Sequence, residues 1–262
     1  MKKFTKLTAF ALALVMALGL LAGCGSSNSD TNSDANTSGD DAAKTKLVVA
    51  TSPDFPPFES LEGGEVVGIE VDILNKIAEK MGMELDIQQM DFDSVIPGVQ
   101  AGKFDVGMSG ITVTDKRKEN VDFSSVYFMA AQAIVVTADS GITGKADLEG
   151  KKVSVQTGTT AEEYCMGNGY EVLAFTANND AAAALTAGKV DAWVVDNEVA
   201  LAMAPELGLT VLEEAMTSEP YAFAFQKGSE LVVPFNEALD ALLADGTVEK
   251  IFQQYGVTYI AP

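Results

Sequence analysis

Two successive runs of short apolar strands and amphipathic helices constrain the fold of this chain more than any other feature. Each run has the order β-α-β-α-β. The elements predicted in the first run lie at 46–50, 70–81, 84–89, 94–101 and 104–107, and those in the second lie at 152–156, 161–167, 171–175, 178–187 and 191–195. Such alternation favours a mainly parallel sheet wrapped by helices, with ligands binding beyond the carboxyl ends of the strands. The sequence therefore predicts an α/β protein of two lobes with a binding cleft between them.

Three more elements are predicted after the second run. They are a strand at 221–225, a helix whose apolar residues recur at helical spacing over 231–242, and a final helix at 248–255. Periodicity alone assigns this tail to neither lobe.

The first 23 residues have the plan of an export signal. Three lysines precede an apolar stretch over 7–22, which is too short for a convincing membrane span. The stretch ends in Leu21-Ala22-Gly23-Cys24, which resembles the lipobox of bacterial lipoproteins. That resemblance implies cleavage before Cys24 and a lipid on its sulfur. A plain secretory signal followed by an incidental cysteine is the alternative.

Residues 24–45 are expected to be a lipidated, disordered tether. The segment is rich in Ser, Asn, Asp, Thr, Gly and Ala and has no large apolar side chain that could stabilise an ordered state. The folded body is thus predicted to lie outside the cytoplasm, held on the outer face of the cell membrane by the lipid alone.

Composition excludes several function classes. Without the signal, 14 basic residues face 38 acidic ones, a net charge of −24, and no basic cluster remains to bind nucleic acid. The chain has no histidine, which argues against metal catalysis and Ser-His chemistry, so no metal and no cofactor are predicted. With Cys24 lipidated, Cys165 has no partner for a disulfide.

An ordered set of motifs between residues 46 and 256 resembles the polar amino-acid-binding proteins of bacterial ABC importers. The segments that carry the resemblance are Phe55-Pro56-Pro57-Phe58-Glu59, Gly68-Ile69-Glu70-Val71-Asp72-Ile73, Ile96-Pro97, Gly102-Lys103-Phe104-Asp105, Ser109-Gly110-Ile111-Thr112-Val113-Thr114 with Arg117, Val121-Asp122-Phe123-Ser124, Gln156-Thr157-Gly158-Thr159-Thr160, and Asp191-Ala192 with Asp196. The resemblance implies the type II periplasmic-binding-protein fold. It also implies a monomer that hands a free amino acid to an importer permease.

The resemblance further implies a particular division of the chain. Lobe 1 would comprise 46–130 plus 221–262 and lobe 2 would comprise 131–220, with the crossings near 127–131 and 218–221. The ligand would bind first to lobe 1, and closure of lobe 2 would complete the site.

A free amino acid is a zwitterion, so its receptor needs one fixed cation and one fixed anion. The resemblance places Arg117 on the ligand carboxylate, which a guanidinium binds through two parallel hydrogen bonds. It places Asp196 on the ligand ammonium. The alternatives are a solvated surface arginine and a helix N-cap for a helix near Glu198.

The remaining predicted contacts follow from the same resemblance. Phe55 and Phe92 would sandwich the ligand side chain, although either aromatic residue could instead belong to the core. Backbone groups near Gly110 and the helix start at Thr159 would bind the polar ends of the ligand. The complete predicted set is Ser52, Phe55, Phe92, Ser109, Gly110, Thr112, Arg117, Gln156, Thr159, Thr160 and Asp196.

Ligand specificity stays open at this point. Several relatives carry an acid where this chain has Ser52, and Asp54, Glu59 or Glu163 could take its place. Glu70 replaces the usual aspartate of its motif, a change expected to be structural.

Two rival functions were considered. A cyclohexadienyl dehydratase shares the fold and would need a proton-donating acid in the cleft, for which Glu198 or Glu163 could be nominated. The second rival function is that of a sensor, whose signal would have to pass through a partner chain. A binding protein is preferred to both, and no enzyme activity is predicted.

Overall fold

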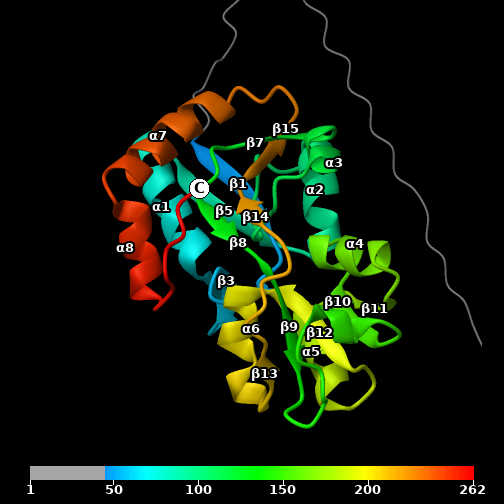
Figure 1. Ribbon diagram of the computed structural model, residues 1–262. Coiled ribbons are helices and arrows are strands. Elements are labelled where there is room, and N and C mark those ends of the chain that lie inside the picture. Colours follow the sequence, from blue (N-terminus) through cyan, green and yellow to red (C-terminus); the bar gives the residue numbers. More distant parts are fainter. Residues whose placement is uncertain (1–44) are drawn as a thin grey trace, which may run out of the picture. The chain divides into compact units, whose positions relative to one another are not determined.

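The computed structural model describes residues 45–262 (Figure 1). The predicted signal peptide at 1–23, the lipidated Cys24 and all but the last residue of the predicted tether lie outside the described residues. None of the helices in this described part is both long enough and apolar enough to cross a membrane.

The first of two five-stranded sheets has the order β5-β1-β6-β15-β7. Its strands are β1 (Lys46–Thr51), β5 (Glu84–Gln89), β6 (Val106–Gly107), β7 (Val121–Phe123) and β15 (Ala224–Gln226). β1 runs parallel to both neighbours, while β15 runs antiparallel to β6 and to β7.

The second sheet repeats this plan with the order β11-β10-β12-β9-β13. Its strands are β9 (Gln132–Val136), β10 (Lys152–Gln156), β11 (Glu171–Phe175), β12 (Ala192–Asp196) and β13 (Thr210–Val211). β10 is parallel to β11 and β12, and β9 is antiparallel to β12 and β13.

The α/β class is confirmed, but each sheet is half parallel and half antiparallel rather than mainly parallel. The reason lies in the strands that connect the two sheets. β8 (Phe128–Ala130) and β14 (Glu219–Tyr221) pair with each other, and β9 and β15 follow them after at most two residues. β9 and β15 enter their sheets directly from these connecting strands, and each pairs there antiparallel with both of its neighbours. The expected single strand at 221–225 is therefore two strands in two sheets.

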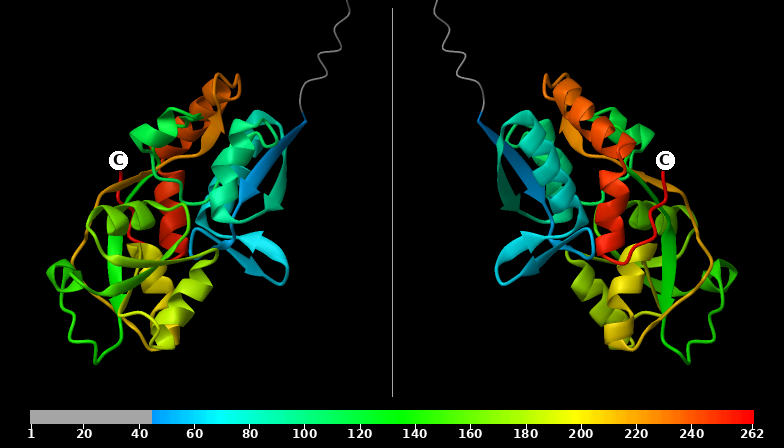
Figure 2. Two further views of the ribbon diagram at one scale, coloured as in Figure 1. Left: turned by 90° about the vertical axis from the view of Figure 1, so that its right-hand side faces the viewer. Right: turned by 90° about the vertical axis from the view of Figure 1, so that its left-hand side faces the viewer.

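Helices cover both sheets (Figures 1 and 2). α1 (Ile69–Met81), α7 (Val232–Ala244) and α8 (Thr247–Gln254) pack against one another beside the first sheet. α2 (Phe92–Gln100) packs on β1 and β15, and the short α3 (Asp115–Lys118) contacts β7. α4 (Thr160–Gly167), α5 (Asn178–Thr186) and α6 (Asn197–Met203) pack on the second sheet. Two 3₁₀ turns lie at Lys145–Leu148 and Pro205–Leu207.

A small hairpin sheet lies between β1 and α1. It consists of β2 (Asp54–Phe55), β3 (Glu59–Glu62) and β4 (Glu65–Val67). Sequence periodicity missed it because its strands are two to four residues long and bear several acidic residues. The hairpin carries Phe55 and Glu59, both buried, toward the edge of the first sheet.

Candidate functional site

Ten of the eleven residues predicted for the site line one cavity. They are Phe55, Phe92, Ser109, Gly110, Thr112, Arg117, Gln156, Thr159, Thr160 and Asp196. Elements of both sheets contribute, and Gln156 and Asp196 end parallel strands of the second sheet. The space for the centre of a water-sized sphere is only about 10 Å³, which is barely enough for one water. An amino acid therefore requires these walls to move apart before it can enter.

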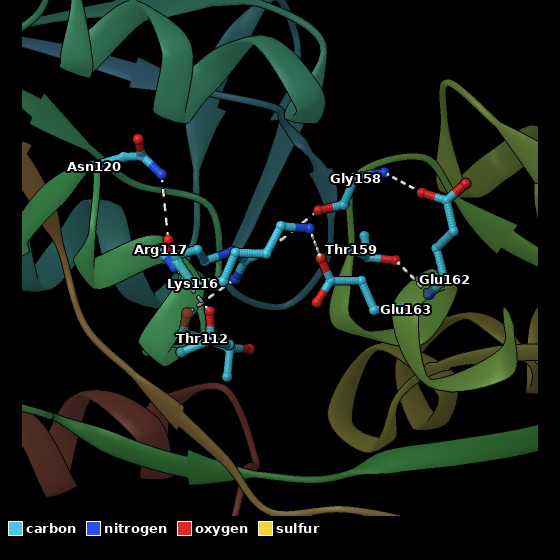
Figure 3. A network of polar contacts seen from close by, with 9 residues as sticks. Thr112, Lys116, Arg117, Asn120, Gly158, Thr159, Glu162 and Glu163 are labelled. Atoms are coloured by element: carbon cyan, nitrogen blue, oxygen red, sulfur yellow. Dashed lines mark hydrogen bonds and ion pairs between the residues drawn. The ribbon is translucent and has the colours of Figure 1, made fainter. Parts of the chain in front are cut away.

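Arg117 is the cation of the cavity. Thr114 caps α3 by accepting a hydrogen bond from the Arg117 N–H over 3.1 Å. The guanidinium of Arg117 donates from Nη1 to the Thr112 carbonyl over 2.9 Å and from Nη2 to the Gly158 carbonyl over 3.1 Å (Figure 3). The Cζ atom lies 5.6 Å from the centroid of the Phe92 ring. This half-buried guanidinium is thus held in place by two carbonyls and an aromatic face.

The guanidinium keeps its charge and has donors to spare. Burial lowers the pKa of Arg117, but arginine remains protonated in proteins. Of its five N–H groups, the described residues engage two. The others can bind a carboxylate placed in the cavity.

Asp196 is the anion on the opposite sheet. It is 7% exposed, and its Oδ1 accepts from the Tyr221 hydroxyl over 2.6 Å while its Oδ2 accepts from Gln132 Nε2 over 3.0 Å. It occupies the N-cap position of α6, but its side chain makes no capping hydrogen bond. Burial raises the pKa of Asp196 to about 7, so a cation beside it would favour its ionised form.

The floor of the cavity is the turn that follows β6. Gly110 has φ +54°, and a Cβ atom there would lie 2.5 Å from Phe55 Cε1, so only glycine fits. Its N–H donates to Glu70 Oε2 over 2.9 Å. Thr112 is buried, and its carbonyl holds Arg117. The backbone is therefore fixed close to any ligand by glycine geometry and a carboxylate beneath it.

The two aromatic residues predicted to flank the ligand belong both to the cavity wall and to the core. Phe55 and Phe92 line the cavity, and each is also packed in a hydrophobic core cluster. Phe55 lies 5.8 Å from Phe58, centroid to centroid. Packing in the hydrophobic core therefore fixes the two aromatic rings that line the cavity.

The start of α4 is partly occupied by its own side chains. Thr159 Oγ1 accepts from the Glu162 N–H over 3.2 Å, and Glu162 Oε2 accepts from the Gly158 N–H over 2.7 Å (Figure 3). This arrangement resembles a capping box. Thr160 Oγ1 accepts from Gln132 Nε2 over 3.3 Å. Fewer helix N–H groups face the cavity than the sequence alone suggested.

Ser52 does not line this cavity. Its hydroxyl donates to Asp54 Oδ1 over 3.0 Å, and it borders a separate pocket of about 350 Å³. Asp54, next to it, accepts from Gln156 Nε2 over 3.1 Å and from the Asn178 N–H over 2.7 Å. Because Gln156 and Asn178 belong to the second sheet and its helices, Asp54 links the two halves of the fold.

The acids considered as alternatives lie elsewhere. Glu163 is exposed and forms an ion pair with Lys116. Glu198 is buried but borders a different pocket with Pro57, Leu201 and Tyr255. Neither lines the cavity around Arg117, so neither of the two nominated acids is placed to donate a proton there.

Sequence reasoning missed Gln132 and Tyr221, the two donors to Asp196. Each lies at a connection between the sheets, 64 and 25 residues from Asp196. No local sequence pattern predicts hydrogen-bond partners so far apart in the chain. Among the described residues, no group of His, Cys, Asp and Glu side chains could hold a metal ion.

Comparisons with known proteins agree with this geometry. The family model for bacterial extracellular solute-binding proteins, family 3, matches residues 47–258. The arginine-binding extracellular protein ArtP of Bacillus subtilis is 35% identical over 90% of this chain and 92% of its own length. The ABC transporter glutamine-binding protein GlnH of the same organism is 32% identical over 95% and 97%. The structure of an ancestral arginine-binding protein bound to glutamine superposes with a TM-score of 0.77 and 41% identity, over 81% of this chain and 98% of that chain.

The fold is that of a binding protein of the two-sheet α/β type. More narrowly, the chain belongs to the bacterial extracellular solute-binding proteins, family 3. The relatives named above are binding proteins and not enzymes, which confirms the non-enzymatic role expected from the sequence.

Proposed function

We propose that this protein captures a free polar amino acid in the cavity around Arg117 and delivers it to an ABC importer. The observation that carries the proposal is the presence of one half-buried cation, Arg117, and one buried acid, Asp196, in the wall of the same cavity. The two charges match the carboxylate and the ammonium of a zwitterion.

Arg117 would bind the ligand carboxylate and Asp196 the ligand ammonium. The free N–H groups of Arg117 suit a carboxylate because charge-assisted pairs of this kind are short and strong. Asp196 already accepts from Tyr221 and Gln132, and each carboxylate oxygen has a further lone pair for an ammonium proton. Phe55 and Phe92 would flank the ligand.

The mechanism proposed is closure of two lobes, with lobe 1 at 46–130 plus 221–262 and lobe 2 at 131–220. Support comes from hydrogen bonds that join the two halves through or beside cavity residues, from Arg117 to Gly158 and from Gln156 and Asn178 to Asp54. The small volume of the cavity supports it too, since a ligand must enter before these contacts form. A ligand that bridges both halves would shift the population toward the closed form.

The ligand is proposed to be an amino acid with a polar or cationic side chain. The relatives support this class, because their names cite arginine and glutamine. Asp54, Ser52 and Asp91 border the pocket next to the cavity, and the acids there favour a positively charged or amide-bearing end group. The choice within this class is for experiment.

Anchoring by a lipid on Cys24 is part of the proposal. The lipobox-like segment at 21–24 and the polar stretch that follows support it. The body would then work as a monomer beside its permease, attached to the membrane through the lipid only.

A thermal-shift screen tests the proposed function. The twenty amino acids, ornithine, citrulline and cystine are added singly, and a tight ligand stabilises the protein by RT ln(1 + [L]/Kd). We expect a rise in Tm with one or a few polar amino acids. No rise with any of them would refute the proposal.

A further inference from the structure

Two buried acids lie directly beneath the cavity floor. Glu59 begins β3 and Glu70 lies in the first turn of α1 (Figure 1). Both side chains are 0% exposed. Neither takes part in any ion pair of the described residues, where every pair joins an exposed lysine to an acid.

Glu70 holds the floor through both of its oxygens. Its Oε2 accepts from the Gly110 N–H over 2.9 Å, and its Oε1 accepts from the Tyr127 hydroxyl. Two donors therefore converge on this carboxylate. Glu70 thus connects the turn at Gly110 with Tyr127, which stands immediately before the connecting strand β8.

Glu59 is only half satisfied as a carboxylate. Its Oε1 accepts from Ser109 Oγ over 3.2 Å, but its Oε2 has no hydrogen-bond donor among the described residues. The adjacent charged or polar groups are Glu70 from α1, Asp54 from β2, Ser109 from the floor turn and the Tyr127 hydroxyl. A second negative charge in this position would be buried next to a first one without any cation.

We infer that Glu59 and Glu70 share a single proton and together position the floor of the binding cavity. The proton resides on Glu59 Oε2 and is donated to Glu70, so the orphaned oxygen becomes a donor. Burial and the neighbouring Glu70 carboxyl raise the pKa of Glu59 well above its ordinary value, in agreement with this geometry. The pair then carries one negative charge, which three donors surround.

The shared proton has a consequence for the ligand site. Because the peptide between Ser109 and Gly110 is planar and trans, an N–H directed to Glu70 points the Ser109 carbonyl in the opposite direction, away from Glu70. Ser109 Oγ is fixed in turn by donating to Glu59 and by accepting from the Ser52 N–H over 3.0 Å. Glu59 and Glu70 are thus positioning residues, and loss of the shared proton would free the turn at Gly110 that forms the cavity floor.

NMR of the ligand-free protein tests the proton. With glutamate labelled by ¹³C at the side-chain carboxyl, we expect one resonance that keeps the shift of a protonated acid at pH 7 and is lost in Glu59→Gln. If a second protonated resonance is present, its loss in Glu198→Gln assigns it to Glu198. If no protonated resonance disappears with Glu59, the inference is overturned.

The Gly110 amide tests the positioning role in the same samples. Glu59→Gln supplies an amide that can still donate to Glu70, whereas Glu59→Leu cannot. We expect hydrogen exchange at Gly110 to match the parent in Glu59→Gln and to be at least tenfold faster in Glu59→Leu. Asp72→Asn is the matched control, since it alters another α1 acid that accepts from a tyrosine, Tyr255, but at the surface.

The two variants also separate positioning from mere filling of space. Equal exchange at Gly110 in Glu59→Gln and Glu59→Leu would overturn the positioning role. If Glu59→Leu does not fold, the pH dependence of the Gly110 amide chemical shift in the parent and in Glu59→Gln tests the inference instead. The Gly110 amide shift should move with pH as the parent loses its proton and should stay constant in Glu59→Gln, and a constant shift in both proteins would contradict the inference.

Discussion

At the scale of single residues, the site depends on two charges supplied by different halves of the fold. Arg117 comes from α3 and Asp196 from the end of β12. Each is fixed by neutral partners, carbonyls in one case and a tyrosine and a glutamine in the other. Neither charge is neutralised by a direct ion pair within the described residues. Both charges are therefore available to a ligand.

Removing the cation should abolish most of the affinity. Arg117→Ala is expected to weaken binding of the amino acid found in the screen by about 2–5 kcal/mol, because the ligand carboxylate loses its buried partner. Lys116→Ala is the matched control, since Lys116 lies on the same helix but is exposed and pairs with Glu163. Titration calorimetry measures both. Equal affinities for Arg117→Ala and the parent would contradict the site.

The acid should make binding depend on pH. The pKa of Asp196 is about 7 without ligand, and a bound ammonium favours its ionised form, so the ligand binds with release of a proton at lower pH. Affinity should therefore fall as pH decreases below 7, approaching about tenfold per pH unit. Calorimetry in two buffers of different ionisation enthalpy detects the released proton. Asp196→Asn should bind weakly and show no such slope, whereas a flat profile in the parent would oppose the assignment.

The residue scale also shows what the sequence could predict of the site. Ten residues that line one cavity were chosen from motif positions, because a family resemblance encodes three-dimensional neighbours. Gln132 and Tyr221 were not predicted, since their hydrogen bonds to Asp196 depend on how the connecting strands pair. Ser52 was expected in the same cavity but bonds to Asp54 beside it.

At the scale of elements, prediction succeeded where periodicity was strong. α1 was expected at 70–81 and spans Ile69–Met81, with Gly82 in the left-handed conformation at its end. The five buried residues of β9 were missed because a short apolar run without alternation fits either a helix or a strand. The half-antiparallel character of both sheets was missed because it arises from the connections and not from the runs themselves.

The start of α4 offers a test at this scale. Thr159→Ala removes the hydroxyl that caps the Glu162 N–H and should cost about 1 kcal/mol of unfolding free energy. Thr186→Ala is the control, because that hydroxyl only bonds back to Ala182 within α5 and alanine is the better helix former. Urea denaturation measures both. An equal effect of the two substitutions would show that the cap contributes nothing.

At the scale of the whole molecule, the protein is proposed to be attached to the membrane through the lipid on Cys24. The described residues carry many more acids than bases, so their net charge repels anionic lipid. Location and binding are thus assigned to separate parts of the chain.

Cys24→Ser tests that separation. The variant should be released from the membrane fraction, because the lipid is the only proposed anchor, and should bind its amino acid with unchanged affinity. Fractionation of expressing cells and calorimetry on the purified protein provide the two readouts. Retention of the variant in the membrane fraction would refute anchoring through Cys24.

The central claim is that one cavity recognises both charges of a free amino acid. Calorimetry of the best ligand from the screen, beside its methyl ester and its analogue without the amino group, tests this most directly. The account predicts tight 1:1 binding of the amino acid and affinities lower by at least about 2 kcal/mol for each analogue, because each leaves Arg117 or Asp196 unpaired in a buried site. Binding of either analogue as tight as that of the parent amino acid would contradict it.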